Sequence, residues 1–281
     1  MLHVLGMSHA ISVLKSMASD GGITHGNWNV ALDNPQWARA PLPEKFKAIG
    51  IDALNVFLIR PTMNWHATLS KGESGEVLAA PPAFWTLLES LPPVTNNDTL
   101  VSFIGGNDHS VLSLVEAPDP YDFLLPGDDK YPLIHGRQPI DVRFIEVNLE
   151  RRMNSTVAML TALRFKHPAL RIFHAMPPPP LASERQILKE PEIFADVIAQ
   201  YGITPLSVRI KVYLVYVRLL MTVLQRLEIG AIPAPADATD EMGGLKEAYS
   251  FGCTHGNHLY GALVADQLAE VLRQGDQHAS V

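Results

Sequence analysis

Five short apolar runs, separated by stretches with helical periodicity, constrain the fold of this chain more than any other feature. Most of the runs are continuous in apolar residues rather than alternating, which is typical of parallel strands covered on both faces. Strands that alternate with helices predict an α/β fold built on a doubly wound, mainly five-stranded parallel sheet with right-handed crossovers. The runs are His3–Met7, Leu54–Ile59, Leu100–Ile104, Leu170–Ala175 and Glu228–Ile232.

Helical patterns fill the intervals between these runs. Asn154 or Ser155 is expected to cap one of the helices, and Pro191 suits the first position of another. The helices are predicted over His9–Met17, Ala83–Leu91, Asn154–Phe165, Pro191–Tyr201, Leu206–Leu227 and His258–Arg273.

Two stretches between the predicted elements are irregular. No break in composition divides the chain, so we expect residues 1–281 to form a single domain. Residues 116–137 are rich in Pro, Asp and Gly and lack periodicity, which predicts an irregular insertion or a lid beside the site. Pro177–Pro180 follows the fourth run directly and is either a strand terminator or a stiff wall of the cleft.

Composition argues against several classes of function. The formal net charge of −7 makes a generally basic surface for nucleic acid unexpected. The single cysteine, Cys253, cannot form an internal disulfide, which fits a reducing, cytoplasmic compartment. The N-terminus lacks the basic and apolar regions of a signal peptide. The longest apolar region, Val212–Leu224, is interrupted by Arg218, so no membrane span is expected.

A serine follows the first predicted strand directly. Ser8 would lie at the carboxyl edge of the sheet, close to the N-terminus of the predicted helix His9–Met17. Backbone N–H groups at that helix end can stabilise a developing oxyanion, which makes Ser8 a candidate nucleophile. Serine is also a common helix N-cap, and the sequence leaves that alternative open.

The motif Gly105-Gly106-Asn107-Asp108 closes the third predicted strand. The amide of Asn107 can donate to an oxyanion through its NH₂ group, and the glycines let the backbone approach a ligand closely. In this interpretation Gly106 and Asp108 line the site, and His9 lines it beside the serine. Gly and Asn are equally typical of an ordinary turn, which is the alternative.

The motif Thr254-His255-Gly256-Asn257 opens the last predicted helix. His255 can take a proton from Ser8 and return it to a leaving group. The two residues are far apart in sequence, but a doubly wound fold brings strand ends together. Ser, Asn and His at three predicted sheet edges therefore suggest acyl transfer through an activated serine. The alternative is a histidine that caps or lines a helix start.

Together the three motifs resemble the sequence blocks of the SGNH (GDSL-like) hydrolase family over most of the chain. The segment Gly105–Asp108 matches the family's Gly-x-Asn-Asp, and His255–Asn257 with Tyr260-Gly261 looks like its terminal block. The resemblance implies a flavodoxin-like, three-layer α/β/α sandwich. It also implies that Ser8 is the nucleophile, that His255 is the base, and that Asn107 and the Ser8 amide form the oxyanion hole.

The chain departs from the family pattern at three places. Met7 stands where the family has an aspartate before the serine. Gly252 stands where the family has an aspartate that orients the histidine and stabilises its cation. No glycine is assigned to the family's second block, since Gly72 and Gly75 fall in the right interval but lack a motif. Without the aspartate at position 252, a backbone carbonyl or another carboxylate takes its role, or the enzyme is slow. The acidic residues near Gly252 in sequence are Asp237, Asp240 and Glu247, and the sequence does not distinguish among them.

Other side chains permit different chemistry. A metal-dependent phosphoesterase is one alternative, but Met7 replaces the bridging carboxylate that such enzymes place after the first strand. Cys253 is a nucleophile in principle, although a lone cysteine is more often a small buried residue. No Gly-rich phosphate loop follows the first strand, so nucleotide binding is not expected. A metal site would need more carboxylates or histidines at close spacing, so neither a metal nor another cofactor is expected. The possible metal set is His255, His258, Asp108, His109 and His174.

The sequence therefore predicts an SGNH-type serine esterase with a Ser-His dyad or an incomplete triad, acting on a small-molecule ester. Because two acidic positions are lost, a non-catalytic ligand-binding protein of the same fold is the alternative. Hydrolysis and transfer to an alcohol are not distinguished, since either water or an alcohol can reach the acyl-enzyme. The identity of the ester and the oligomeric state also stay open.

Overall fold

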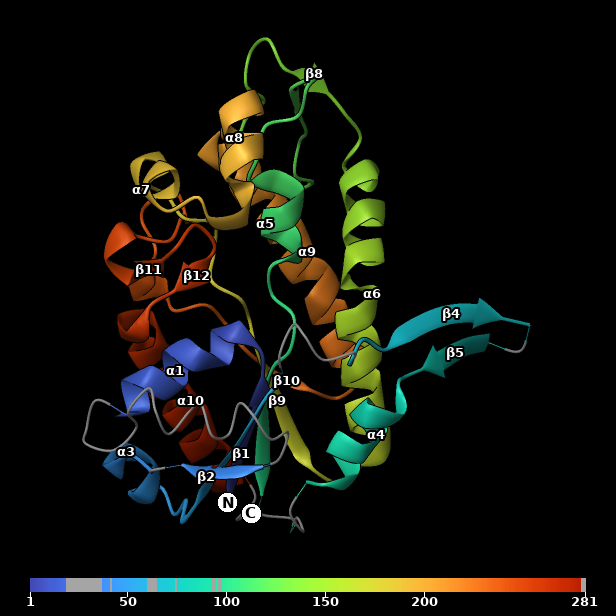
Figure 1. Ribbon diagram of the computed structural model, residues 1–281, viewed down its shortest axis with the longest axis vertical. Helices are drawn as coiled ribbons and strands as arrows, with labels where there is room; N and C mark the ends of the chain where they lie inside the picture. The colour runs from blue at the N-terminus through green and yellow to red at the C-terminus, as the bar shows by residue number, and fades with distance from the viewer. Residues whose placement is uncertain are drawn as a thin grey trace.

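A computed structural model describes residues 1–18, 37–40, 42–59, 65–73, 75–91, 95 and 98–278. In this part of the chain the central sheet has the strand order β10-β9-β6-β1-β3-β2, with neighbours parallel except β2, which is antiparallel to β3 (Figure 1). The five predicted strands are confirmed, and β2 (Ala38–Ala40) is added at one edge. The confirmed strands are β1 (Leu2–Gly6), β3 (Leu54–Leu58), β6 (Thr99–Phe103), β9 (Arg171–Ala175) and β10 (Gly230–Ile232).

Helices cover both faces of the sheet and complete three layers (Figure 1). Neighbouring residues of one strand enter different layers, because side chains alternate across a sheet. Val4 of β1 belongs to the apolar cluster of α1 and α10, whereas Leu5 belongs to that of α4, α6 and α9. Each such buried side chain contributes about 1.5–3 kcal/mol to folding. The helices are α1 (Ser8–Ala18), α4 (Pro82–Glu89), α6 (Val142–Lys166), α9 (Leu206–Arg226) and α10 (His258–His278).

Shorter elements connect these layers. The predicted helix Pro191–Tyr201 is a 3₁₀ turn, η1 (Glu192–Phe194), followed by α8 (Ala195–Tyr201), and Pro191 precedes both. The other short helices are α3 (Glu44–Lys47), α5 (Asp108–Ser113), α7 (Glu184–Lys189), η2 (Ala236–Ala238) and η3 (Glu247–Tyr249). The small two-stranded sheets pair β4 (Thr68–Gly72) with β5 (Gly75–Ala79), β7 (Tyr121–Asp122) with β8 (Gln138–Pro139), and β11 (Ser250–Phe251) with β12 (His255–Gly256).

One helix begins well before its predicted start. α6 begins at Val142, and Asp141 caps it by accepting a 2.9 Å hydrogen bond from a backbone N–H of the first turn. Asn154 and Ser155 therefore lie inside the helix, and the prediction that either caps it is wrong. The carboxamide of Asn154 instead bonds both backbone groups of Leu69, at 2.8 and 3.0 Å, and so fixes the β4–β5 hairpin to α6. Charged residues in the first turns of α6 interrupt its apolar stripe, so the sequence pattern does not indicate where the helix begins.

The segment 116–137, which the structure describes in full, lies against α9. Asp122 and Lys211 of α9 form a buried ion pair, and the Tyr131 hydroxyl donates a 2.8 Å hydrogen bond to the carbonyl of Met242. No residue of this segment lines either of the two cavities that contain Ser8. The segment is therefore attached to α9 and does not border either cavity.

Pro177–Pro180 follows β9 and is buried. The Tyr213 hydroxyl donates to the carbonyl of Pro177 at 3.0 Å, and a backbone N–H donates to that of Pro180 at 2.8 Å. The segment lies behind Gly106, where a Cβ would be 3.2 Å from Pro177. These prolines end the strand and support the site from behind, but they line neither Ser8 cavity.

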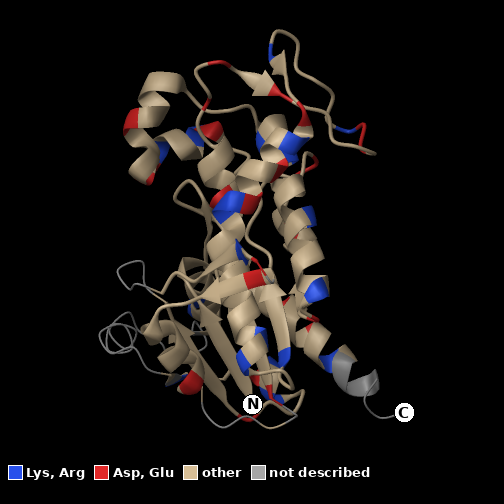
Figure 2. Cartoon of the chain, turned by 90° about the vertical axis from the view of Figure 1, so that its right-hand side faces the viewer, with Lys and Arg blue, Asp and Glu red and all other residues tan. Residues whose placement is uncertain are grey.

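The longest apolar region of the sequence, Val212–Leu224, lies within α9. Neither α9 nor another helix of the described chain combines the length and the apolar character that crossing a bilayer requires. Figure 2 shows acidic and basic residues interspersed along the helices in the side view.

Candidate active site

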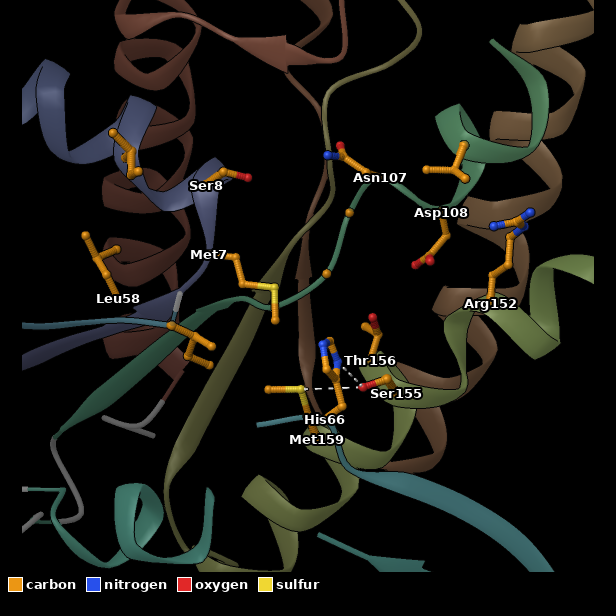
Figure 3. A pocket seen from close by; sticks show the side chains of 15 residues that line it. Met7, Ser8, Leu58, His66, Asn107, Asp108, Arg152, Ser155, Thr156 and Met159 are labelled. Carbon is orange, nitrogen blue, oxygen red and sulfur yellow. Dashed lines mark hydrogen bonds between the residues drawn. The ribbon is translucent and has the colours of Figure 1, made fainter. Parts of the chain in front are cut away.

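Ser8 and Asn107 follow neighbouring strands at the same edge of the sheet. β1 and β6 are paired and parallel, so their carboxyl ends meet. Ser8 is the first residue of α1, and Asn107 immediately precedes α5. In Figure 3 the Ser8 hydroxyl and the Asn107 carboxamide point toward the same space. The structure therefore brings the first two predicted site residues together.

The third predicted residue, His255, lies against the serine. Its Nε2 is 3.0 Å from the hydroxyl oxygen of Ser8. Among the described residues, His255 is the hydrogen-bond partner of this hydroxyl, which bonds no backbone amide of α1. The helix also begins at Ser8 itself, so the N-cap interpretation does not fit. The serine is exposed and accessible to a ligand.

Close packing of the last helix on the first places His255 there. A Cβ on Gly261 of α10 would be 2.1 Å from the backbone oxygen of Ser12 in α1, so only glycine permits this approach. Asn257 caps α10 by accepting a 2.9 Å hydrogen bond from the N–H of Leu259. β12, which carries His255, ends immediately before this cap. The backbones of two helices therefore set the distance between serine and histidine.

The second ring nitrogen of His255, Nδ1, lies 3.0 Å from the hydroxyl oxygen of Thr254. If Nε2 accepts a hydrogen bond from the Ser8 hydroxyl, the ring proton is on Nδ1, which donates to the Thr254 hydroxyl. Burial lowers the pKa of His255 below its ordinary value of 6.5, and the negative charge of Glu192 opposes this shift. The imidazole is therefore neutral at pH 7 and able to accept a proton.

The three acidic residues suggested as partners of the imidazole form their hydrogen bonds or ion pairs with other groups, Asp237 only through its backbone. Asp240 accepts a 2.8 Å hydrogen bond from a nearby backbone N–H. Glu247 pairs with an exposed arginine at 3.1 Å. Asp237 accepts from a lysine through its backbone carbonyl. None of the three hydrogen-bonds or ion-pairs with His255 in the described structure, so these suggestions are wrong.

Two glycines bring the Asn107 segment close to its neighbours. Gly105 and Gly106 have φ values of +75° and +121°, which L side chains rarely adopt. A Cβ on Gly105 would be 2.2 Å from the Thr156 hydroxyl oxygen, and one on Gly106 would be 2.9 Å from the His9 ring. The Asn107 side chain makes no cap bond to α5, and its Oδ1 is buried without a partner. A plain turn interpretation therefore leaves this side chain without a role.

Ser8 lies between two cavities. The first, of about 450 Å³, lies on the Asn107 side and includes Gly106 and Asp108 in its lining (Figure 3). The second, of about 460 Å³, lies on the His255 side. A ligand in the first cavity also meets apolar side chains, which include Met7, Leu58, Val111 and Met159.

Asp108 and His9 have different positions. Burial raises the pKa of Asp108 to about 6, against the opposing charge of Arg152 in the same cavity. His9 lies behind Gly106, with its ring centroid 5.0 Å from that of His255, and does not line either cavity. Burial, and then the neighbouring His255, lower the pKa of His9 to about 3. His9 therefore lies behind the two cavities rather than in their lining, and it is neutral at pH 7.

Sequence reasoning missed several charged or polar residues of the cavities, among them Arg152, His66 and Glu192. Arg152 and His66 line the first cavity, and Glu192 lines the second. His66 is held by a 3.1 Å contact between its Nδ1 and the hydroxyl oxygen of Ser155. None of the three belongs to a motif. Only the folding of α6, of the segment before β4 and of η1 brings them to the serine.

The two candidates for the second-block glycine lie away from the site. Gly72 and Gly75 form the turn of the β4–β5 hairpin and line neither Ser8 cavity. The segment that directly follows β3, residues 60–64, lies outside the described residues. No second-block glycine is therefore assigned.

Two alternatives from the sequence are a metal site and a cysteine nucleophile, and the described residues support neither. No three His, Cys, Asp or Glu side chains gather there as a metal-binding group. The histidines of the possible metal set include His109 and His174, whose pKa values burial lowers to about 3 and about 4. Burial, followed by a hydrogen bond to Glu192, raises the pKa of the Cys253 thiol to about 12, which leaves it protonated and unreactive.

Comparisons with known proteins identify a likeness in structure alone. No protein-family model matches the sequence, and no curated protein matches it. One similar structure is the periplasmic domain of a lipopolysaccharide acetyltransferase from Salmonella ser. Paratyphi A, with a TM-score of 0.46, 9% identity, and coverage of 96% of this chain and 82% of that one.

Two further structures are similar. A putative acylhydrolase from Bacteroides fragilis has a TM-score of 0.43 and 9% identity, with coverage of 98% of this chain and 86% of that one. A putative arylesterase from Agrobacterium tumefaciens has a TM-score of 0.41 and 14% identity, with coverage of 98% and 99%. At these scores the likeness carries no assignment of function, which rests on the site itself.

Proposed function

We propose that this chain is an SGNH-like serine esterase that acts on small-molecule esters through Ser8, His255 and Asn107. The observation that carries the proposal is the 3.0 Å contact between the Ser8 hydroxyl and His255 Nε2, at a sheet edge that the Asn107 amide also faces. A nucleophile within hydrogen-bond reach of a neutral base is what acyl transfer through serine requires.

The reaction follows from these groups. The Ser8 oxygen attacks the ester carbonyl carbon while its proton passes to Nε2 of His255. The carbonyl oxygen becomes an oxyanion, which accepts hydrogen bonds from the Asn107 NH₂ and the backbone N–H of Ser8 at the start of α1. The tetrahedral intermediate collapses, the Nε2 proton goes to the leaving alcohol, and an acyl-serine remains. Water then attacks the acyl-serine by the same steps and releases the acid.

The first cavity suits the acyl group of the ester. Its apolar residues Met7, Leu58 and Met159 can cover a hydrocarbon chain, and its volume of about 450 Å³ admits a small one. Arg152 and Asp108 in its lining supply polar contacts. The alcohol part of the ester then leaves through the other side of Ser8, where His255 returns the proton.

Replacement of the serine hydroxyl tests the proposal. Ser8→Ala is expected to lower kcat/KM for p-nitrophenyl acetate by at least about 10³-fold, because attack on the carbonyl then has no nucleophile. Ser90→Ala is the matched control, since its hydroxyl bonds the backbone of α4 at 2.8 Å away from the site. Circular dichroism checks that both variants fold. Full activity of the Ser8 variant contradicts the proposal.

A non-catalytic binding protein is the second candidate. The partner of His255 Nδ1 is a hydroxyl, that of Thr254, rather than a carboxylate, and this favours the candidate. A fluorophosphonate probe separates the two, because it labels only an activated serine. Labelling of Ser8 supports the esterase, whereas no labelling together with saturable binding of an acylated sugar supports the binding protein. Addition of an alcohol acceptor to the assay then distinguishes transfer from hydrolysis.

A further inference from the structure

A carboxylate from a distant part of the chain fills the space that Gly252 leaves empty. Gly252 lies three residues before His255, in the turn between β11 and β12, with φ of +59°. A Cβ built on it would be 2.5 Å from Oε1 and 2.6 Å from Cδ of Glu192. The carboxyl group of Glu192 therefore occupies the place where a side chain at position 252 would begin.

The backbone of Glu192 is held in an unfavourable conformation. Its φ is +53°, which among the described non-glycine residues is shared only by Glu228. Such a conformation persists where the surroundings enforce it, and it is found more often at functional sites than elsewhere. The surroundings here include Cys253, whose thiol and backbone N–H approach Glu192 Oε2 at 3.2 and 3.5 Å.

The charge of Glu192 is not neutralised within the described residues. No Lys or Arg pairs with it there, and the hydrogen bonds from Cys253 reach Oε2, leaving Oε1 without a donor. Glu192, Ser8 and His255 line the same cavity. The carboxylate and the imidazole therefore border the same cavity, and one carboxylate oxygen accepts no hydrogen bond from the described residues.

Several other titratable groups surround His255. His9 of α1 lies 5.0 Å away between ring centroids and is neutral at pH 7. Lys15 of α1 and His258 of α10 line the same cavity, and Glu190 accepts a 3.2 Å hydrogen bond from the N–H of Gly252. Of these groups, only Glu192 raises the pKa of His255, which is the effect of a charge that stabilises the imidazolium.

We infer that Glu192 is the positioning carboxylate of this site, supplied from the segment before α8 in place of a residue at position 252. It stabilises the cation that His255 becomes when it takes the Ser8 proton, and the proton stays on the imidazole throughout. The Thr254 hydroxyl fixes the Nδ1 proton, at 3.0 Å, while Glu192 supplies the charge. The inference rests on the proposed function.

Glu192→Gln removes the charge and keeps the shape of the side chain. We expect kcat for p-nitrophenyl acetate to fall about tenfold with KM unchanged, a smaller loss than for a buried triad aspartate because Glu192 is exposed. We also expect the acid limb of the pH–rate profile to move to lower pH, because His255 loses a negative neighbour that raises its pKa. Glu190→Gln is the matched control and should change neither.

A second experiment moves the carboxylate from residue 192 to residue 252. In Glu192→Ala the space beside residue 252 is free, and Gly252→Asp added to it places a new carboxylate in that space. Asp tolerates a positive φ better than most residues, so the turn should persist. We expect the double variant to recover kcat and the pH profile of the native protein relative to Glu192→Ala. Failure to recover, with the fold intact by circular dichroism, counts against the inference.

NMR titration of His255 keeps this inference separate from the proposed function. The pKa of His255 is compared in Ser8→Ala and Ser8→Ala/Glu192→Gln, where no turnover is needed. A lower pKa of His255 in the second variant supports the inference about Glu192. Failure of a fluorophosphonate to label native Ser8 would overturn the esterase proposal, but it would not affect this result. An unchanged pKa, with normal labelling of Ser8 in both native protein and Glu192→Gln, overturns the inference and leaves the esterase intact.

Discussion

The two sides of Ser8 are built differently. On the Asn107 side, Gly105 and Gly106 bring the backbone against Thr156 and the buried His9, so the segment is fixed by the core. On the His255 side, the β11–β12 hairpin carries an exposed Phe251 at its turn, and the charged Glu192 beside it is also exposed. Packing therefore fixes the Asn107 segment completely. On the His255 side, packing of α10 on α1 sets the backbone position of the histidine, whereas hydrogen bonds and charge act on its exposed surroundings.

This contrast has a consequence for substitutions. Where tight packing holds a segment, an added methyl group has nowhere to go and the whole protein is destabilised. Where exposed polar groups surround the imidazole, a change alters the protonation of the histidine and barely affects folding. Rate and stability should therefore separate according to whether the altered group holds the backbone in place or acts on the reacting atoms.

Among the substitutions that compare the two sides of Ser8, the largest effect is expected from Asn107→Ala. Loss of an oxyanion donor should lower kcat about 10²–10³-fold, equivalent to about 2.7–4 kcal/mol. Stability should change little, because the Asn107 side chain makes no cap bond to α5. Asn257→Ala is the contrasting variant: this asparagine caps α10, so its loss should cost about 1 kcal/mol of unfolding free energy. Steady-state kinetics and urea unfolding measure both. Normal kcat in Asn107→Ala would remove this residue from the mechanism.

Gly105→Ala tests the tightly packed Asn107 side of Ser8. The new Cβ would be 2.2 Å from the Thr156 hydroxyl oxygen at a φ of +75°, so we expect a loss of about 2–4 kcal/mol in unfolding free energy. Phe251→Ala, on the exposed side, should change it by about 0.5 kcal/mol or less. Equal losses in urea unfolding would show that the two sides are not built differently.

The smallest effect concerns pH. Catalysis needs neutral His255, and burial lowers its pKa below 6.5, so the acid limb of kcat/KM should have its midpoint below 6.5. Buried His9 and His109 have pKa values of about 3, whereas the unfolded chain takes up these protons near 6.5. Stability therefore falls as pH decreases below 6.5, and circular dichroism must accompany each rate. A midpoint above 6.5 would contradict the prediction.

The sequence pattern predicts those parts of the fold that periodicity controls. β1, β3, β6, β9 and β10 lie close to their predicted positions because both faces of each are buried and their residues are accordingly apolar. Periodicity does not predict the start of α6, because charged residues interrupt the apolar stripe before Asn154. β2, with three residues, is too short to carry a period.

The site residues also divide into those that the sequence pattern predicts and those that it does not. Ser8, Asn107 and His255 belong to motifs that end or begin regular elements, so their meeting at one sheet edge follows from topology. Glu192 belongs to no motif, and it lies against Gly252 with a backbone φ of +53°, which the sequence does not predict. The sequence shows that an aspartate is absent at position 252, but only the folded chain shows what fills its place.

The contact of α10 with α1 through Gly261 also orders events during synthesis. The ribosome makes the Ser8 hydroxyl 247 residues before the imidazole that contacts it. A nascent chain therefore lacks this contact until α10 has emerged and docked on α1. If Ser8 and His255 act as proposed, reactivity toward esters should appear only after α10 has docked, and a chain that ends before His255 should have none.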